Sequence, residues 1–300
     1  MNMNWKSLFS TLLFTASLAA MIFSGYEFCG YLLEEARSDS LRNELAALHS
    51  ETPSQNTEYA GDERCIQENA AFSQSGNGIE HASDASDEAD IDRNAEALPE
   101  NASSSVLPST ESHGIAALNA RNRDCIGWIT IDGTAIDYPI MHRPSQKDYY
   151  LYRDFNGRKS YNGTLYASEI CDPETSDNVI LYGHNMRSGK MFAGLTKYKE
   201  KSFYEAHRYI IFETLDGVHI YEIMFALTTP VYTGNDFEYY SFADAADAQA
   251  FDAYLSACAS RALYDTGVTA AYGDHLLTLC TCEYSQDNGR MLVVAKRIDA

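Results

Sequence analysis

The chain has 300 residues and a formal net charge of −21, from 22 basic and 43 acidic side chains. A hydrophobic share of 45% is enough for a buried core and excludes a wholly disordered chain. Because phosphate binding needs a basic face, the acidity argues against a nucleic-acid-binding protein. The charge is uneven: residues 27–112 carry 19 acids and 4 bases, and residues 113–300 carry 24 acids and 17 bases. Most of the excess negative charge therefore lies before a mildly acidic globular region of ordinary composition.

The N-terminal segment at residues 7–26 is uncharged and mostly apolar. About 20 such residues match the thickness of a bilayer core, which predicts a transmembrane anchor at 7–26 after a cytoplasmic tip at 1–6. Lys6 precedes the run and acids follow it, so we expect a single-pass cell-membrane protein with its C-terminal bulk extracellular. Two alternatives remain: a signal peptide cleaved near Ala19, and a buried helix of a soluble protein.

The segment between the anchor and the globular region divides in two. Apolar residues near helical spacing predict a helical stalk at 27–49 that lifts the domain off the membrane. Residues 50–112 lose this periodicity and are rich in Ser, Asn, Asp, Glu and Ala. Such a segment cannot bury enough surface to offset its ordering entropy, so we predict a disordered acidic linker. We therefore expect the folded domain at 113–300, and we expect a chain that starts near His113 to fold and be active.

Short strands dominate the predicted domain. The expected strands are 126–131, 134–140, 163–168, 179–183, 209–214, 218–228, 276–282 and 290–298. Asp-Gly pairs at 132–133 and 216–217 predict two hairpins. The expected helices are a short one that ends near Asp124, one at 190–198 and a long one at 242–263. This pattern is typical of a mainly β protein, either a barrel or a sandwich.

Three residues of the domain could together perform nucleophilic catalysis. Seven cysteines cannot all pair, so at least one thiol is expected to be free. Cys282 ends one predicted strand and Arg290 begins the next, so an antiparallel return would bring the guanidinium near the thiol and favour the thiolate. His184 follows a strand in a polar loop and could serve as the acid–base partner. From spacing alone, purely structural roles for these residues remain open.

The motifs around these residues resemble those of a known family. Thr278-Leu279-Cys280-Thr281-Cys282 matches the TLxTC motif of the sortases, membrane-anchored cysteine transpeptidases of Gram-positive bacteria; Tyr182-Gly183-His184-Asn185 resembles the segment with the family histidine, and Arg290 stands where the family arginine follows. Segments at 127–131, 134–140, 149–151 and 191–195 resemble class B. The resemblance covers about residues 115–298. It implies a sortase-type closed β-barrel of about eight strands, with an N-terminal helix and a long helix before the catalytic strand.

The resemblance also implies a reaction. Cys282 would attack the threonine carbonyl of a C-terminal sorting motif, NPxT-like in class B, in a secreted protein. His184 would protonate the leaving fragment, Arg290 would bind the oxyanion or the motif's backbone, and a peptidoglycan precursor or stem-peptide amine would accept the acyl group. Thr281 and Glu283 are candidate substrate-binding or tuning residues. No cofactor is implied.

Two departures and several alternatives accompany this interpretation. Cys280 stands where serine is common in class B, which raises the question of which thiol reacts, and the acidic stretch is long for the family. The alternatives are a pilin-polymerising sortase, a sortase-like non-catalytic module, and a zinc module built from Cys280, Cys282 and His184. The remaining domain histidines are interpreted as structural or surface residues; they are His142, His207, His219 and His275.

Overall fold

The structure is a computed structural model that describes residues 5–50, 114–231 and 237–298. The predicted linker lies outside these residues except for Ser50. Most of the predicted cytoplasmic tip lies outside them too.

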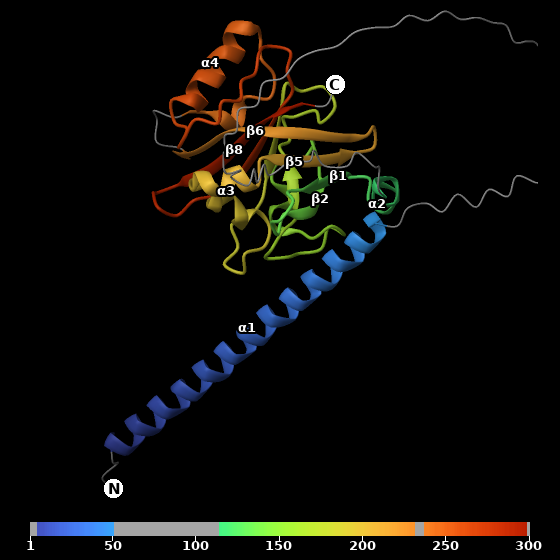
Figure 1. Cartoon of the computed structure of the whole chain (residues 1–300). Coiled ribbons are helices and arrows are strands. Elements are labelled where there is room, and N and C mark those ends of the chain that lie inside the picture. The colour runs from blue at the N-terminus through green and yellow to red at the C-terminus, as the bar shows by residue number, and fades with distance from the viewer. Residues whose placement is uncertain (1–4, 51–113, 232–236, 299–300) are drawn as a thin grey trace, which may run out of the picture. The chain divides into compact units, whose positions relative to one another are not determined.

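Eight strands form a closed barrel, which confirms the predicted fold class (Figure 1). The strands are β1 (Cys125–Thr130), β2 (Asp137–Met141), β3 (Leu165–Ala167), β4 (Asn178–Tyr182), β5 (Tyr209–Thr214), β6 (Val218–Pro230), β7 (Leu276–Cys282) and β8 (Gly289–Arg297). Their order around the barrel is β1-β2-β3-β4-β7-β8-β6-β5. Neighbouring strands are antiparallel except for two parallel pairs, β2 with β3 and β4 with β7.

The predicted hairpins are present, and the barrel core follows from side-chain alternation. β1 pairs with β2 and β5 with β6 across the two Asp-Gly turns. On β7, Leu277 and Leu279 point into the main barrel core, whereas Leu276 and Cys280 belong to a second cluster that packs against the helix before β7. This alternation is the period of two expected of a strand whose faces contact different cores.

The helical elements of the barrel region are short, and the helix predicted before β7 is shorter than expected. They are α2 (Ile115–Arg121), α3 (Lys201–Ala206) and α4 (Ala248–Ala259), with 3-10 helices η1 (Tyr149–Tyr152), η2 (Phe192–Lys199) and η3 (Tyr239–Ser241). The expected helix at 242–263 is limited to α4. Asp247 caps its N-terminus by accepting a hydrogen bond from the Ala250 amide at 2.8 Å. Beyond its C-terminus, the Leu263 amide bonds instead to the Ala226 carbonyl of β6, so the backbone turns away from the helix.

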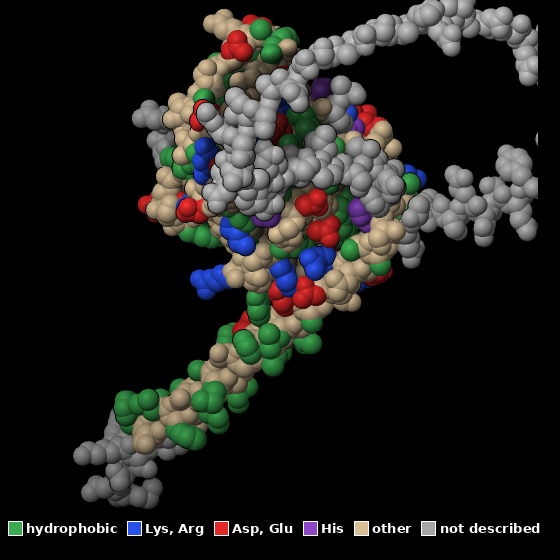
Figure 2. Space-filling view, in the orientation of Figure 1, with side chains coloured by type: hydrophobic (Ala, Val, Ile, Leu, Met, Phe, Trp, Pro, Cys, Tyr) green, Lys and Arg blue, Asp and Glu red, His purple; other side chains and the backbone are tan. Residues whose placement is uncertain are grey.

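The N-terminal part of the chain is one continuous helix, α1 (Trp5–Ser50), of 46 residues. Its first half exposes large apolar side chains such as Phe14, Met21 and Phe23. Figure 2 shows hydrophobic side chains exposed along this part of the helix. By length and composition, this helix could cross a membrane.

The second half of α1, where we predicted a helical stalk, packs against the barrel. Leu45 is only 2% exposed and belongs to one cluster with Leu118 and Trp128. The ring of His49 stacks on Trp128 with centroids 4.4 Å apart. The leucine periodicity that predicted a helix therefore serves to bury one helix face against β1 and α2.

The end of α1 meets the start of α2 directly. The Gly114 amide donates a hydrogen bond to the His49 carbonyl at 2.6 Å. The described residues on either side of the acidic stretch are therefore hydrogen-bonded to each other.

Candidate active site

Cys282 and Arg290 lie on adjacent strands of the barrel. Cys282 is the last residue of β7, and its Cα partner on β8 is Arg290. The predicted antiparallel return is therefore confirmed. Nη1 of the Arg290 guanidinium donates a hydrogen bond to the Gly289 carbonyl at 2.9 Å, which keeps the guanidinium close to the β7–β8 loop.

His184 reaches the same place from β4. The strand pairs in parallel with β7, with Tyr182 opposite Cys280, so the residues that follow both strands emerge at the same end. Asn185 then ties the two segments together, because its side-chain amide donates to the Cys282 carbonyl at 2.9 Å. The parallel pair thus brings the histidine loop to the end of the cysteine strand.

A backbone carbonyl fixes the imidazole of His184. Its Nε2 lies 2.8 Å from the carbonyl oxygen of Leu151, and its ring packs beside that of Tyr152 at 5.3 Å between centroids. Because a carbonyl only accepts, this contact assigns the hydrogen to Nε2. Nδ1 is then the ring nitrogen that carries the lone pair.

These three residues share one groove of about 380 Å³. Aromatic side chains form much of its wall, namely Tyr152, Tyr166, Tyr182, Tyr239 and Tyr240. A larger cavity of about 560 Å³ lies elsewhere and is lined in part by His142, His219 and His275. We place the candidate active site in the smaller groove, because Cys282, His184 and Arg290 line it together, whereas none of these three residues lines the larger cavity.

The two neighbouring thiols differ in environment. Cys280 is 1% exposed, and its sulfur lies 3.3 Å from the hydroxyl of Tyr239. Burial raises the pKa of Cys280 to about 12, although the Tyr239 hydrogen bond and the charge of Arg290 oppose this shift. Cys282 is partly exposed in the groove. Since the thiolate is the nucleophile, the environment favours Cys282 as the reactive thiol.

Thr281 and Glu283 have partners within the protein. The Thr281 hydroxyl is buried and donates to the Gly183 carbonyl at 2.7 Å, which joins β7 to the residue before His184. Glu283, 6% exposed, accepts from Lys199 Nζ at 2.6 Å and from Ser285. Burial alone would raise the pKa of Glu283, but these hydrogen bonds outweigh it and lower the pKa. Glu283 does not line the groove.

Sequence reasoning missed two groups at this site. Asn185 directly follows His184 in the quoted motif, so a polar side chain next to the predicted acid–base residue was the available signal. The Leu151 carbonyl had no signal, because every residue carries the same backbone group and only the fold selects one of them.

The zinc alternative gains no support from the geometry. Among residues 5–50, 114–231 and 237–298, no three His, Cys, Asp or Glu side chains converge as metal ligands. The six cysteines in these ranges are all unpaired thiols.

Comparison with known proteins agrees with the site. A family model described as the sortase domain matches residues 129–298. Sortase B of Listeria monocytogenes is 35% identical over 185 residues, covering 60% of this chain and 72% of the relative. Sortase B of Staphylococcus aureus is 31% identical over 199 residues, covering 64% and 76%.

Solved structures give the same result. The X-ray structure of Clostridium perfringens sortase B has a TM-score of 0.57 at 30% identity and covers 61% of this chain and 99% of its own. The Staphylococcus aureus sortase B–substrate complex has a TM-score of 0.57 at 28% identity and covers 62% and 85%. With the family model matching more than half its length and sortases B among its relatives, this chain belongs to the sortase family as a class B sortase transpeptidase.

Proposed function

We propose that this sortase cleaves a C-terminal sorting motif of secreted proteins after threonine and joins the threonine carbonyl to a peptidoglycan amine, which anchors the protein to the cell wall. The observation that carries the proposal is the arrangement of Cys282, Arg290 and His184 around one groove. The family supplies the reaction class, a transpeptidation between a sorting motif and an amine.

In the first step, the Cys282 thiolate attacks the threonine carbonyl carbon. The tetrahedral oxyanion forms beside Arg290, whose guanidinium offers the positive charge and N–H donors that stabilise it. The C–N bond then breaks, and His184 gives its proton to the nitrogen of the departing fragment. The product is a thioacyl-enzyme at Cys282.

In the second step, the acceptor amine replaces the thiol. Its nitrogen attacks the thioester carbonyl and loses a proton to His184, and the Cys282 thiolate leaves. A peptide bond to the new amine replaces the bond that was cut, so no external energy source is needed. An acceptor amine on a pilin would follow the same chemistry, which makes the acceptor a separate question from the catalytic site.

The first half of α1 supports a location for this reaction. We propose that the apolar residues of 7–26 span the cell membrane with the N-terminus in the cytoplasm, and that the barrel lies outside. The uncharged run, its exposure on α1 and Lys6 before it support this orientation.

A peptide library tests the reaction directly. The full chain is incubated with peptides that vary around an NPxT-like core, with a diamine as acceptor, and the products are identified by mass spectrometry. We expect cleavage after threonine and a threonine–diamine adduct, both absent in Cys282→Ala. A library in which no peptide is cut after threonine, or is cut equally by Cys282→Ala, would overturn the proposal.

A further inference from the structure

Two separate loops hold His184 in place. Residues 149–164 begin with η1 and supply the Leu151 carbonyl that accepts from the imidazole. The second loop runs from Gly183 to Phe192, and in it the Phe192 amide donates to the His184 carbonyl at 3.0 Å. The position of the imidazole therefore depends on how these two loops are held relative to each other.

The carboxylate of Glu35 on α1 bonds to both loops. One oxygen accepts from Lys190 Nζ, in the second loop, and the other accepts from the Asn162 side-chain amide at 3.2 Å, in the first. The Glu35 side chain is only 18% exposed, and Asn162 is 2% exposed. Asp39, one turn further along α1, reinforces the contact with Lys190 at 2.6 Å.

The Asn162 contact leads directly to the imidazole. Gly163 follows Asn162 and packs so closely on Leu151 that a Cβ there would fall 2.3 Å from the Leu151 carbonyl oxygen. That oxygen is the acceptor for His184. A displacement of Asn162 would therefore be transmitted to the atom that orients the imidazole, because close-packed contacts transmit small shifts.

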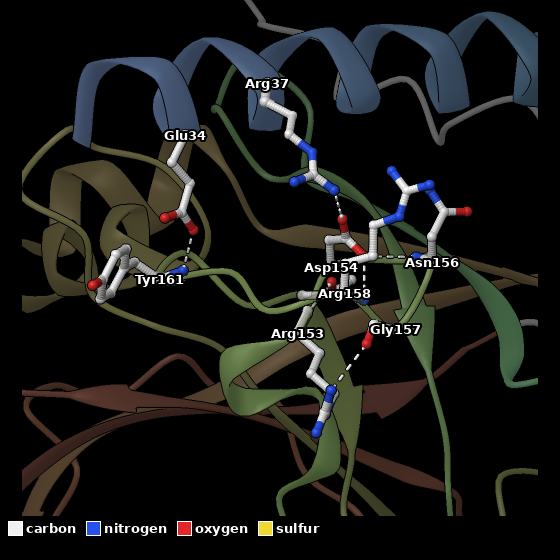
Figure 3. Close-up of polar contacts among 9 residues, drawn as sticks. Glu34, Arg37, Arg153, Asp154, Asn156, Gly157, Arg158 and Tyr161 are labelled. Carbon is white, nitrogen blue, oxygen red and sulfur yellow. Dashed lines mark hydrogen bonds and ion pairs between the residues drawn. The ribbon is translucent and has the colours of Figure 1, made fainter. Parts of the chain in front are cut away.

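Neighbouring residues of α1 hold the outer part of the same loop (Figure 3). The Tyr161 amide donates to the Glu34 carboxylate, and Arg37 Nη2 donates to Asp154 at 3.3 Å. Asp154 in turn accepts from the amides of Asn156 and Arg158, so the ion pair is connected to the loop backbone. Two turns of α1 thus bind the loop along its length.

We propose that Glu35 is a positioning residue of this enzyme, which sets the geometry of His184 by joining the two loops that carry it. The catalytic part of this statement rests on the role proposed for His184 above. The structural part, that Glu35 controls the imidazole, is independent of that role. The helix that begins as the proposed membrane anchor thereby becomes part of the active-site support.

The kinetic test uses the full chain in detergent micelles. Glu35→Ala is compared with Glu44→Ala, a matched control that loses an α1 carboxylate whose ion-pair partner, Arg121 at 2.7 Å, lies outside both loops. For Glu35→Ala we expect kcat to fall about tenfold or more with KM nearly unchanged, since a misplaced catalytic group costs rate rather than binding. Glu35→Gln, which keeps the length and one acceptor, should recover part of the loss. Equal kcat in Glu35→Ala and Glu44→Ala would overturn the proposal.

A second measurement needs no substrate, so it tests the positioning role of Glu35 independently of the proposed transpeptidation. The ¹⁵N and ¹H resonances of the His184 ring report its tautomer and the Nε2–H bond to Leu151. They should shift in Glu35→Ala and stay unchanged in Glu44→Ala. If they shift although the wild type cuts no peptide, the positioning role stands and the proposed reaction falls; if they do not shift in folded Glu35→Ala, the positioning role is wrong.

A variant on the barrel side decides the matter if Glu35→Ala does not fold. Lys190→Met removes the other partner of the same contact and leaves α1 intact. It should shift the same ring resonances and lower kcat in the same direction. Unshifted resonances with wild-type kcat in Lys190→Met would then overturn the proposal.

Discussion

Arg290 stands directly across the β7–β8 ladder from Cys282. The backbone of Arg290 is therefore placed by strand register, and its guanidinium is held near the turn by a hydrogen bond to the Gly289 carbonyl. In the mechanism proposed above, an oxyanion at Cys282 would form beside this positive charge, and a preorganised charge of this kind is the condition for electrostatic catalysis.

Arg290→Ala should lower kcat/KM by about 10²–10³, the usual cost of losing one oxyanion donor. Arg290→Lys should recover only part of it, because an ammonium lacks the planar fork of donors. Steady-state cleavage of a sorting-motif peptide measures both. Activity of Arg290→Ala near that of the wild type would remove the residue from the mechanism.

Alkylation should distinguish the two thiols of β7. In a background with Cys29 and Cys65 changed to Ser, iodoacetamide near pH 8 should label Cys282 and leave Cys280 unlabelled, because burial raises the pKa of Cys280 to about 12 and covers its sulfur. Peptide mass spectrometry locates the label. Cys280→Ala should keep most of the peptide cleavage, and a loss comparable to that of Cys282→Ala, with the fold intact, would refute the choice of nucleophile.

Gly163→Ala should impair catalysis through Leu151. The glycine has φ +61°, and an added Cβ would lie 2.3 Å from the Leu151 carbonyl oxygen. We expect kcat to fall about ten- to hundredfold as His184 is displaced, with a stability cost of about 1–3 kcal/mol.

Gly267→Ala is the control for that change. Gly267 has a similar φ of +77° but no atom within 4 Å of an added Cβ. It should show the backbone strain as a lower Tm while kcat stays unchanged. An equal loss of kcat in both variants would show that the effect of Gly163→Ala is not transmitted through Leu151.

Glu283 should make stability depend on acid pH. Its pKa in the folded chain lies below the ordinary value of 4.5, so the ionised side chain stabilises the fold above that value, and this stabilisation is lost as the pH falls through the lowered pKa. Thermal unfolding followed from pH 7 to pH 3 should show a steeper acid loss in the wild type than in Glu283→Gln. Parallel curves would mean that the contact with Lys199 contributes no pH-dependent stability.

Two deletions should have opposite effects. Removing residues 54–107 should leave Tm unchanged or raised, because His49 and Gly114 are already joined and a shorter loop lowers the closure cost by on the order of 1 kcal/mol. A chain that starts at His113 should lose several °C or fail to fold, since the Leu45 contact alone is worth about 2–5 kcal/mol. Scanning calorimetry compares them. A fully stable chain from His113 would show that the contacts of α1 with the barrel contribute no stability.

The sequence was sufficient where the signals are local. The Asp-Gly turns and the alternation of apolar residues predicted both hairpins, and the short loop between β7 and β8 predicted Arg290 opposite Cys282. These features depend on residues close together in the chain, so period and turn chemistry are enough.

The sequence was insufficient where segments that are distant in the chain meet. Asn185 and Cys282 are 97 residues apart in the chain. No pattern in either segment predicts the parallel pairing of β4 with β7 that brings them together. The leucines of α1 predicted an apolar helix face but not the surface that covers it. The length of α4 was overestimated because apolar spacing continues past both ends, whereas the Asp247 cap and the pairing with β6 set the limits.

The continuity of α1 has a consequence for where this enzyme can work. Glu35 lies nine residues beyond Tyr26, which is about 14 Å of helix at 1.5 Å per residue. With the apolar half in a bilayer, as we propose, the groove stays at one height above the lipid surface and has no tether along which to travel outward. Substrate and acceptor must therefore both reach that height. The distance from the membrane at which the reaction takes place is set by a helix and not by a flexible segment.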